Sequence, residues 1–421
     1  MIARIEALNY RCLRYVSQDL DRFHVLVGPN ASGKTTFLDV VAFLGRLVAD
    51  GLDAAIEERT ANPQDLVWSR AGDRFELAVE AAIPDSLAAT LPKGDYDTIR
   101  YQVAITLEDS TAGVGIADET VQFVKRTNSL SESQAQDEFP TPGHPPESVL
   151  LSSHVRNTKT IVTKRSGGND NFYPEVEKEK AKRWAMSYKL GLRKSALGNL
   201  PEDESKFPVS TWLKTLLSER VQQFALNSLA IRHASPPTRT KGFNPDGSNL
   251  PWVINRLERE NPSQLQEWVA HLRTAFSDLT NILTIERPDD RHRYLVLEYE
   301  GGLRVPSWMA SDGTLRMLAL TLPAYLPGLR GAYLIEEPEN GIHPRAVETM
   351  YQSLSSVYSA QILMATHSPV ILSLAEPQDV LCFAKTPEGG TDIVRGDRHP
   401  CLRDWHGESN LGALFAAGVL G

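Results

Sequence analysis

The chain has 421 residues, of which 41% are hydrophobic and 23% charged, and a formal net charge of −9. This length and composition fit a globular protein of two or three lobes with a sizeable core. The negative charge argues against a protein that coats nucleic acid with a basic surface, although a local basic groove is compatible with it. No apolar run approaches the roughly 20 residues that span a bilayer, so we expect no membrane partner.

The N-terminus and the cysteines show no pattern of export. Met1-Ile2-Ala3-Arg4-Ile5 lacks the features of a signal peptide. Cys12, Cys382 and Cys401 are scattered, which matches neither a disulfide framework nor the spacing of a metal site. We therefore expect free thiols in a cytoplasmic protein.

The most specific motif is a glycine-rich run at 28–35, Gly-Pro-Asn-Ala-Ser-Gly-Lys-Thr. It fits G-x-x-x-x-G-K-[ST] and lies between a predicted apolar strand at 23–27 and a helical pattern, which is the context of a phosphate-binding loop. The backbone N–H groups and the helix start form an anion cradle. Lys34 would reach the outer phosphates, and Thr35 would hold Mg²⁺. The predicted nucleotide ligands are Gly28, Asn30, Ser32, Gly33, Lys34, Thr35 and Thr36.

Alternating apolar and polar residues predict an edge strand at 2–8, beside the strand that precedes the glycine loop, and further strands at 75–79, 101–105 and 121–124. The last three indicate a small antiparallel lobe. Residues 126–148 are rich in Ser, Glu, Gln and Pro, which predicts a solvated loop.

From about residue 174 to 232 the pattern is helical and locally basic. This region forms either a solvated helix face or a contact surface for nucleic acid or a partner protein. Helices are then predicted at 250–259 and 262–279, and strands at 281–286 and 293–299. The basic residues of the first region are Lys178, Lys180, Lys182, Arg183, Lys189, Arg193 and Lys194.

A predicted helix opens with Ala310-Ser311-Asp312-Gly313 and runs to about Leu322. Ser311 can cap this helix, and small residues at a helix N-terminus can bind an anion. Any helix can begin in this way, so the weight of the signal comes from its position shortly before a pair of carboxylates.

Two apolar strands end in polar residues. The first, at 332–337, ends in Glu336 and Glu337, and ligands bind at the carboxyl ends of strands in a parallel sheet. Glu336 would hold Mg²⁺ through water, and Glu337 would polarise the attacking water as a general base or an orienting group. The alternative is two charges that begin a loop. The second strand leads into Thr366-His367-Ser368, where His367 either contacts the γ-phosphate or is an ordinary surface histidine.

These four elements, in this order, resemble the ATP-binding heads of the ABC superfamily, in the branch that contains RecF, SMC proteins and the OLD-family nucleases. Asn9-Tyr10-Arg11 is similar to the start of that branch, and Ser311-Asp312-Gly313-Thr314 to its signature motif. Residues 336–344, Glu-Glu-Pro-Glu-Asn-Gly-Ile-His-Pro, are similar to its Walker B motif and D-loop, and Thr366-His367-Ser368-Pro369 to its switch histidine. The resemblance covers roughly 1–50 and 245–385.

The resemblance implies an α/β fold, a P-loop ABC-type nucleotide-binding head with an antiparallel β lobe and an inserted helical region. Residues 1–150 would form the first part of the head, with the P-loop and the β lobe. Residues 151–279 would be a mainly helical, locally basic insertion. Residues 280–421 would complete the head with the signature, Walker B, D-loop and switch histidine.

The resemblance also implies an assembly. In such proteins two heads enclose two ATP molecules, so Ser311 and Gly313 would act in trans on ATP and Mg²⁺ held by the partner chain. The expected oligomer is a homodimer or a higher homo-oligomer. The family's Q-loop glutamine cannot be placed from the pattern, with Gln64 and Gln102 as candidates.

Only about fifty residues follow His367, too few for the Toprim nuclease domain of the OLD family. The resemblance therefore implies a stand-alone, slow ATPase subunit that controls a separate effector, a nuclease or toxin, in bacterial anti-phage defence. One alternative is a RecF-like DNA-repair clamp on duplex DNA. Another is a scaffold that nucleotide stabilises, with little turnover.

Overall fold

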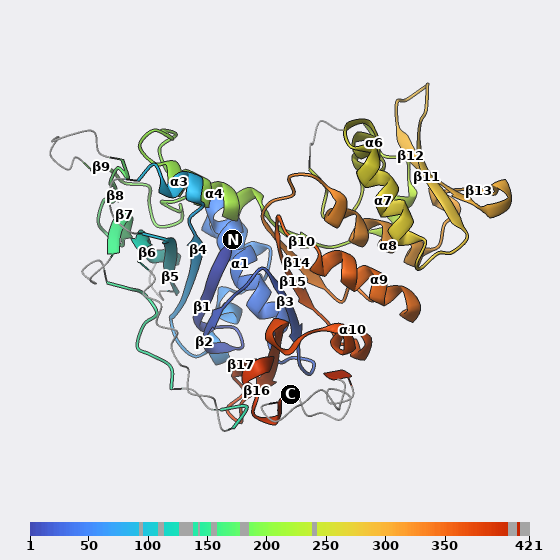
Figure 1. Ribbon diagram of the computed structural model, residues 1–421. Helices are drawn as coiled ribbons and strands as arrows, with labels where there is room; N and C mark the ends of the chain where they lie inside the picture. The colour runs from blue at the N-terminus through green and yellow to red at the C-terminus, as the bar shows by residue number, and fades with distance from the viewer. Residues whose placement is uncertain are drawn as a thin grey trace. The chain divides into compact units, whose positions relative to one another are not determined.

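The computed structural model describes residues 1–91, 96–107, 113–125, 138–141, 144–152, 158–176, 185–237, 242–402 and 411–412. The chain forms two compact units. Within the described ranges, the first unit contains residues 1–221 and 377–402, and the second contains residues 222–376 and 411–412. Figure 1 follows the chain through both units in colour.

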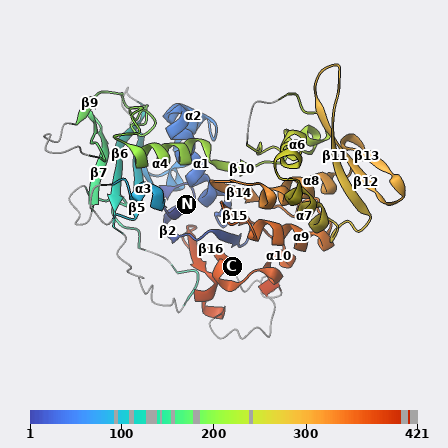
Figure 2. The same cartoon turned by 45° about the horizontal axis from the view of Figure 1, so that its top comes forward.

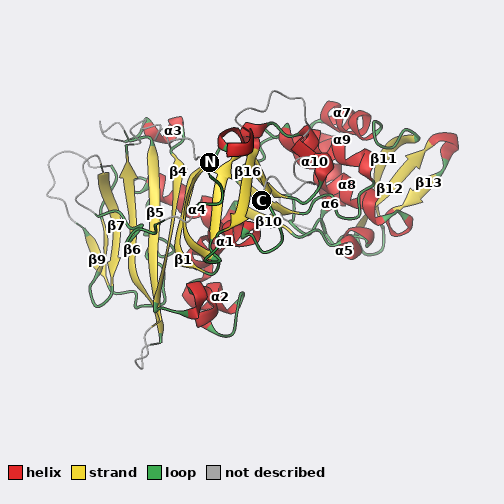
Figure 3. Ribbon diagram, turned by 90° about the horizontal axis from the view of Figure 1, so that it is seen from below, coloured by secondary structure: helices red, strands yellow, loops and turns green. Residues whose placement is uncertain are grey.

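An antiparallel sheet of eight strands dominates the first unit, in the order β2-β1-β4-β5-β6-β7-β8-β9. Figure 3 shows most of its strands side by side in yellow. The predicted antiparallel lobe is therefore confirmed and is larger than expected. The prediction of an edge strand at 2–8 is wrong, because β1 pairs with β2 and β4 inside this sheet and not with the strand before the glycine loop. Its strands are β1 (Ile2–Tyr10), β2 (Leu13–Asp19), β4 (Arg74–Ala82), β5 (Thr98–Leu107), β6 (Val114–Val124), β7 (Thr158–Arg165), β8 (Asp170–Phe172) and β9 (Met186–Tyr188).

Two helices, α1 (Lys34–Asp50) and α4 (Pro208–Glu219), pack on each other and against this sheet, as Figures 1 and 2 show. A Cβ atom added to Gly45 of α1 would lie 2.5 Å from the carbonyl oxygen of Leu217 in α4, so only glycine permits this approach. The rings of Tyr10, Phe43 and Phe75 contact one another between helix and sheet. The short helices α2 (Leu52–Glu57) and α3 (Asp85–Ala88) complete the helices of this unit's described part.

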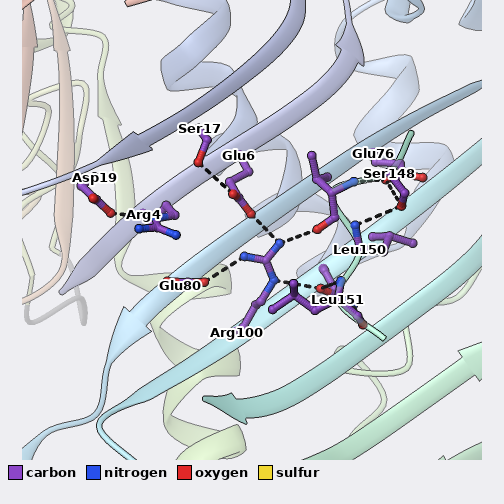
Figure 4. Close-up of polar contacts among 12 residues, drawn as sticks. Arg4, Glu6, Ser17, Asp19, Glu76, Glu80, Arg100, Ser148, Leu150 and Leu151 are labelled. Carbon is purple, nitrogen blue, oxygen red and sulfur yellow. Dashed lines mark hydrogen bonds and ion pairs between the residues drawn. The ribbon is translucent and has the colours of Figure 1, made fainter. Parts of the chain in front are cut away.

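Part of the sheet carries a row of polar side chains. In the strand register Arg4 lies opposite Glu80, and Glu80 lies opposite Arg100. The buried Arg100 guanidinium pairs with Glu80 and Glu6, at 2.9 and 2.5 Å, and donates to the Val149 carbonyl oxygen at 2.7 Å (Figure 4). Buried charges require such partners.

Residues 148–151 lie across these polar side chains, as Figure 4 shows. Glu76 accepts from the Val149 N–H at 2.8 Å, and Gln102 both accepts from the Leu151 N–H and donates to its carbonyl oxygen, each at 2.9 Å. Val149 is buried, so the solvated loop predicted at 126–148 gives way to a packed segment directly after it. Residues 126–137 and 142–143 of that predicted loop lie outside the described ranges.

The first unit also contains β3 (Phe23–Val27), β16 (Val380–Lys385) and β17 (Thr391–Arg395). β16 runs parallel to β3 and antiparallel to β17. β16 thus lies beside the strand that leads into the glycine loop, and β17 follows on the other side of β16. The predicted strand at 23–27 is confirmed.

The second unit contains the parallel strands β14 (Ala332–Glu336) and β15 (Gln361–Ala365), with β10 (Val221–Phe224) beside β14. The buried Trp268 donates to the Thr321 hydroxyl at 2.8 Å and links two of its helices, α7 and α8. An antiparallel sheet of β11 (Leu279–Glu286), β12 (Arg293–Tyr299) and β13 (Arg304–Pro306) completes the unit's sheets. Its helices are α5 (Ser228–Arg232), α6 (Leu250–Glu260), α7 (Pro262–Leu272), α8 (Asp312–Thr321), α9 (Pro344–Ser355) and α10 (Pro369–Leu374).

The helical pattern predicted over about 174–232 is partly wrong. It contains helices α4 and α5, but Met186–Tyr188 extends the large sheet and Val221–Phe224 forms β10. These strands have only three and four residues, too few for a period to show in the sequence. Among the basic residues, Arg193 pairs with Asp53 at 2.7 Å, and Lys189 and Lys194 are exposed. Lys178, Lys180, Lys182 and Arg183 lie outside the described residues.

The helix predicted at 262–279 ends at Leu272, because Leu279 already begins β11. The other helices and strands predicted between 250 and 365 are confirmed within a few residues of their expected bounds. Across the part of the chain that the structure describes, no helix combines the length and hydropathy needed to cross a membrane.

Candidate nucleotide-binding site

The glycine loop joins β3 to α1, and its backbone is left-handed at three positions. Gly28, Ala31 and Gly33 have φ values of +150°, +61° and +104°. A Cβ atom at Gly28 would lie 2.2 Å from the carbonyl oxygen of Phe383, so a larger residue cannot occupy this position. The loop therefore has the tight backbone that a phosphate cradle needs.

Two buried polar side chains of the loop are suited to an anion. The Lys34 ammonium donates to the carbonyl oxygens of Gly28 at 2.8 Å and Pro29 at 3.0 Å, and Lys34 is 7% exposed. Ser32 is fully buried, and its hydroxyl has no hydrogen-bond partner among the described residues. A buried hydroxyl without a partner is uncommon, and a bound phosphate would supply one. The residues present thus fit a nucleotide phosphate.

The turn between β1 and β2 is fixed to the start of α1. Asp39 of α1 accepts from the Tyr10 hydroxyl at 2.6 Å and from Arg11 at 3.2 Å. Burial, reinforced by the Asp39 charge, raises the pKa of Tyr10, so this phenol remains a proton donor. The Cys12 thiol donates to the Thr36 hydroxyl at 3.3 Å. This network holds Asn9-Tyr10-Arg11 beside the predicted nucleotide ligands.

The paired carboxylates begin at the end of β14. Glu336 is the last residue of that strand and lies opposite Ala365 in the parallel register. Glu337 has a φ of +47°, and its N–H donates to the Ala365 carbonyl oxygen at 2.8 Å. The left-handed backbone turns the chain sharply as the strand ends. A non-glycine residue in this conformation is uncommon and often marks a functional site.

A glutamine that the sequence did not single out contacts the first carboxylate. Gln223 of β10 donates to Glu336 at 3.2 Å. Gln64 instead donates to the carbonyl oxygens of Arg70 and Gly72, and Gln102 lies in the Arg100 network. Among the described residues, Gln223 is therefore a better candidate for the Q-loop glutamine than the two predicted ones. The short strand around it was hidden in a region with a helical pattern.

Glu339 connects the D-loop to the switch histidine. Its carboxylate accepts from the Thr366 hydroxyl at 2.6 Å and from the backbone N–H of His367 at 3.2 Å. Asn340 in turn donates to the Glu337 carboxylate. The structure thus places Glu336, Glu337 and His367 at the same end of the two parallel strands.

The signature residues lie at the start of α8. Ser311 caps the helix by accepting from the Thr314 N–H at 3.1 Å, and Asp312 pairs with Arg316 at 2.9 Å. A Cβ atom at Gly313 would lie 2.4 Å from the carbonyl oxygen of Gly341 in the D-loop. The start of α8 and the turn after β14 are therefore in contact within the second unit, and glycine is required at that contact.

The predicted site residues form two groups. Gly28, Asn30, Ser32, Gly33, Lys34, Thr35 and Thr36 belong to the first unit, whereas Ser311, Gly313, Glu336, Glu337 and His367 belong to the second. Among the described residues, no group of three His, Cys, Asp or Glu side chains is arranged to hold a metal ion. Hydroxyl and carboxylate oxygens suit Mg²⁺, which is commonly bound by one or two protein groups together with phosphates and water. Thr35 in the first unit and Glu336 in the second each carry oxygens of this kind.

Comparison with solved structures shows the fold. The chain is similar to an Smc head bound to the C-terminal winged-helix domain of ScpA, with 12% identity, 93% of this chain and 97% of that chain covered, and a TM-score of 0.52. It is similar to the Smc head domain with an extended coiled coil bound to the C-terminal domain of ScpA from Pyrococcus furiosus, with 12% identity, 93% and 95% covered, and a TM-score of 0.51. The chain therefore has the mixed α/β fold of SMC head domains, as predicted.

Comparison of the sequence with protein families identifies a matching family. A family described as "AAA domain, putative AbiEii toxin, Type IV TA system" matches residues 23–373, from the strand before the glycine loop to the helix after His367. The curated proteins contain no match. Because the family match spans most of the chain, the protein belongs to the AbiEii-type family of AAA domains.

Proposed function

We propose that this protein binds and hydrolyses ATP, dimerises head to head around ATP, and controls a separate effector. The observation that carries the proposal is the end of the β14–β15 pair. There Glu336 and Glu337 lie at the end of β14, His367 follows the neighbouring β15, and Glu339 accepts a hydrogen bond from the His367 N–H. Acidic and imidazole groups gathered at the carboxyl ends of parallel strands suit catalysis on a ligand at that edge.

Each group has a role in phosphoryl transfer. Lys34 and the loop N–H groups would bind the β- and γ-phosphates, and Asn30, Ser32 and Thr36 would line the cradle. Mg²⁺, held by Thr35 and through water by Glu336, would neutralise charge on the phosphate oxygens. Glu337 would orient the attacking water and accept its proton, while His367 would donate to the γ-phosphate.

The dimer would complete the site. The Ser311 hydroxyl is exposed at the start of a ten-residue helix, where a partner's γ-phosphate could bind. Since that phosphate would contact both chains, hydrolysis would remove the contact that favours the closed dimer. ATP would thereby act as a switch of assembly.

The effector is inferred from the family. A family described by a toxin of toxin–antitoxin systems supports a role in bacterial defence, with a nuclease or toxin as the controlled partner. The SMC heads in the two similar structures bind ScpA, which supports a partner protein here as well. Cytoplasmic location is part of the same proposal.

Nucleotide binding is tested first with a Lys34→Ala variant. Removing a charged hydrogen-bond donor should weaken MgATP binding by about 10- to 100-fold, measured by calorimetry. Lys385→Ala, which removes an exposed lysine of β16, is the matched control and should bind as the wild type does. Equal ATP affinity of the Lys34→Ala variant and the wild type would contradict the assignment of the loop.

Assays of ATP turnover and DNA binding by the wild type separate the alternatives. Turnover by the wild type supports the ATPase, whereas tight binding without turnover favours the nucleotide-stabilised scaffold. ATP-dependent, salt-sensitive binding of duplex DNA would favour the RecF-like clamp.

A further inference from the structure

One side chain of strand β17, near the end of the described chain, contacts the backbone of the glycine loop. Thr391 is 5% exposed, and its hydroxyl donates to the Ser32 carbonyl oxygen at 2.9 Å. The two residues are separated by 359 positions in the sequence. Nothing in the glycine-loop motif requires a residue at this place.

Thr391 also fills space that the loop leaves open. A Cβ atom at Gly33 would lie 2.2 Å from the Thr391 hydroxyl oxygen and 3.0 Å from its methyl carbon. The absence of a side chain at Gly33 thus allows the threonine to lie directly against the loop, next to the start of α1. Glycine is therefore required at position 33 for two reasons, its left-handed backbone and the close approach of Thr391 from β17.

The backbone of Thr391 extends this contact to the β1–β2 turn. Its N–H donates to the Cys12 carbonyl oxygen at 3.1 Å, and the Cys12 sulfur lies 3.6 Å from the Thr391 hydroxyl oxygen. Cys12 itself donates to Thr36. Thr391 therefore connects strand β17 to both the glycine loop and the β1–β2 turn.

We propose that Thr391 is a positioning residue for ATP binding, which holds the Ser32–Gly33 peptide in the orientation that binds phosphate. Fixing the Ser32 carbonyl oxygen on one side of the peptide fixes the Gly33 N–H on the opposite side. This hydrogen bond keeps the loop in its binding geometry before the nucleotide arrives, and a preorganised site loses less free energy on binding. The inference rests on the proposed nucleotide-binding function.

The test compares three variants of the full chain. Thr391→Val keeps the shape but removes the donor, and it should weaken MgATP binding by about three- to tenfold. Thr391→Ser retains the hydroxyl and should restore affinity to nearly the wild-type value. Thr386→Val is the matched control, because the Thr386 hydroxyl accepts from the Gly390 N–H within the β16–β17 turn. It should bind MgATP as the wild type does.

Melting temperature without nucleotide separates positioning from structural support. A purely structural threonine would lower the melting temperature of Thr391→Val but leave the affinity of the folded protein unchanged, which would overturn the inference. In steady-state turnover we expect KM to rise with kcat unchanged, as for a lost ground-state contact.

The control variants distinguish a failure of the proposed nucleotide-binding function from a failure of the role proposed for Thr391. If the wild type binds MgATP no better than Lys34→Ala, the proposed function fails and the inference with it. If the wild type binds, Lys34→Ala does not, and Thr391→Val equals the wild type, only the positioning role of Thr391 is refuted.

Discussion

A Glu337→Gln variant should lose about 10²- to 10⁴-fold in ATP turnover, the usual contribution of a general base. Glutamine has the size of glutamate and can still accept from the Asn340 amide, but it cannot take a proton from water. The affinity for MgATP should stay unchanged, because the proposed phosphate ligands are untouched. Phosphate release under single-turnover conditions measures the first quantity, and calorimetry the second.

The matched control for this prediction is Glu348→Gln. Glu348 lies on α9 and is exposed, and its carboxylate accepts from the Gln352 amide at 3.2 Å. Its turnover should equal that of the wild type. If Glu337→Gln turns over ATP at the wild-type rate, another group activates the water and the proposed role of Glu337 is wrong.

An Arg100→Ala variant should lose about 3–5 kcal/mol of the free energy of unfolding, because it leaves two carboxylates without their buried partner. Glu80 and Glu6 pair with Arg100, and their side chains are 6% and 13% exposed. The Val149 carbonyl oxygen loses its donor as well, which weakens the attachment of residues 148–151. Urea-induced unfolding followed by circular dichroism measures the change.

Arg4→Ala provides the comparison on the same sheet. Arg4 pairs with Asp19 at 2.7 Å, with side chains 29% and 56% exposed, so its loss should cost no more than about 1 kcal/mol. Similar losses in the two variants would show that the Arg100 network contributes no more than a surface ion pair. Arg100→Lys should fall between them, since one ammonium cannot satisfy all four acceptors.

The sequence predicted the parts of the candidate site whose residues lie close together in the chain. The glycine loop, the Glu336–Glu337 pair and the His367 tip each lie within a few residues of an apolar strand, so spacing alone indicated their roles. The parallel register of β14 and β15 then determined that two of these tips meet.

Contacts between distant segments left no pattern in the sequence. Gln223 lies 113 positions from Glu336, and Thr391 lies 359 positions from Ser32. Both pairs form because separate strands join sheets beside the motifs. The three-residue strands β8 and β9 were hidden for another reason, since the ladder of a neighbouring strand stabilises them and their own periodicity does not.

The central claim, that a signature residue of one chain acts on ATP held by another, has a direct test. A Glu337→Gln chain and a Ser311→Arg chain are co-expressed with different tags, and dimers that contain one copy of each are purified. Each parent alone should be inactive. The mixed dimer retains one intact site, formed by the phosphate loop and Glu337 of one chain and Ser311 of the other, and should show about half of the wild-type turnover. A mixed dimer as inactive as its parents, or wild-type turnover by Ser311→Arg alone, would contradict the account.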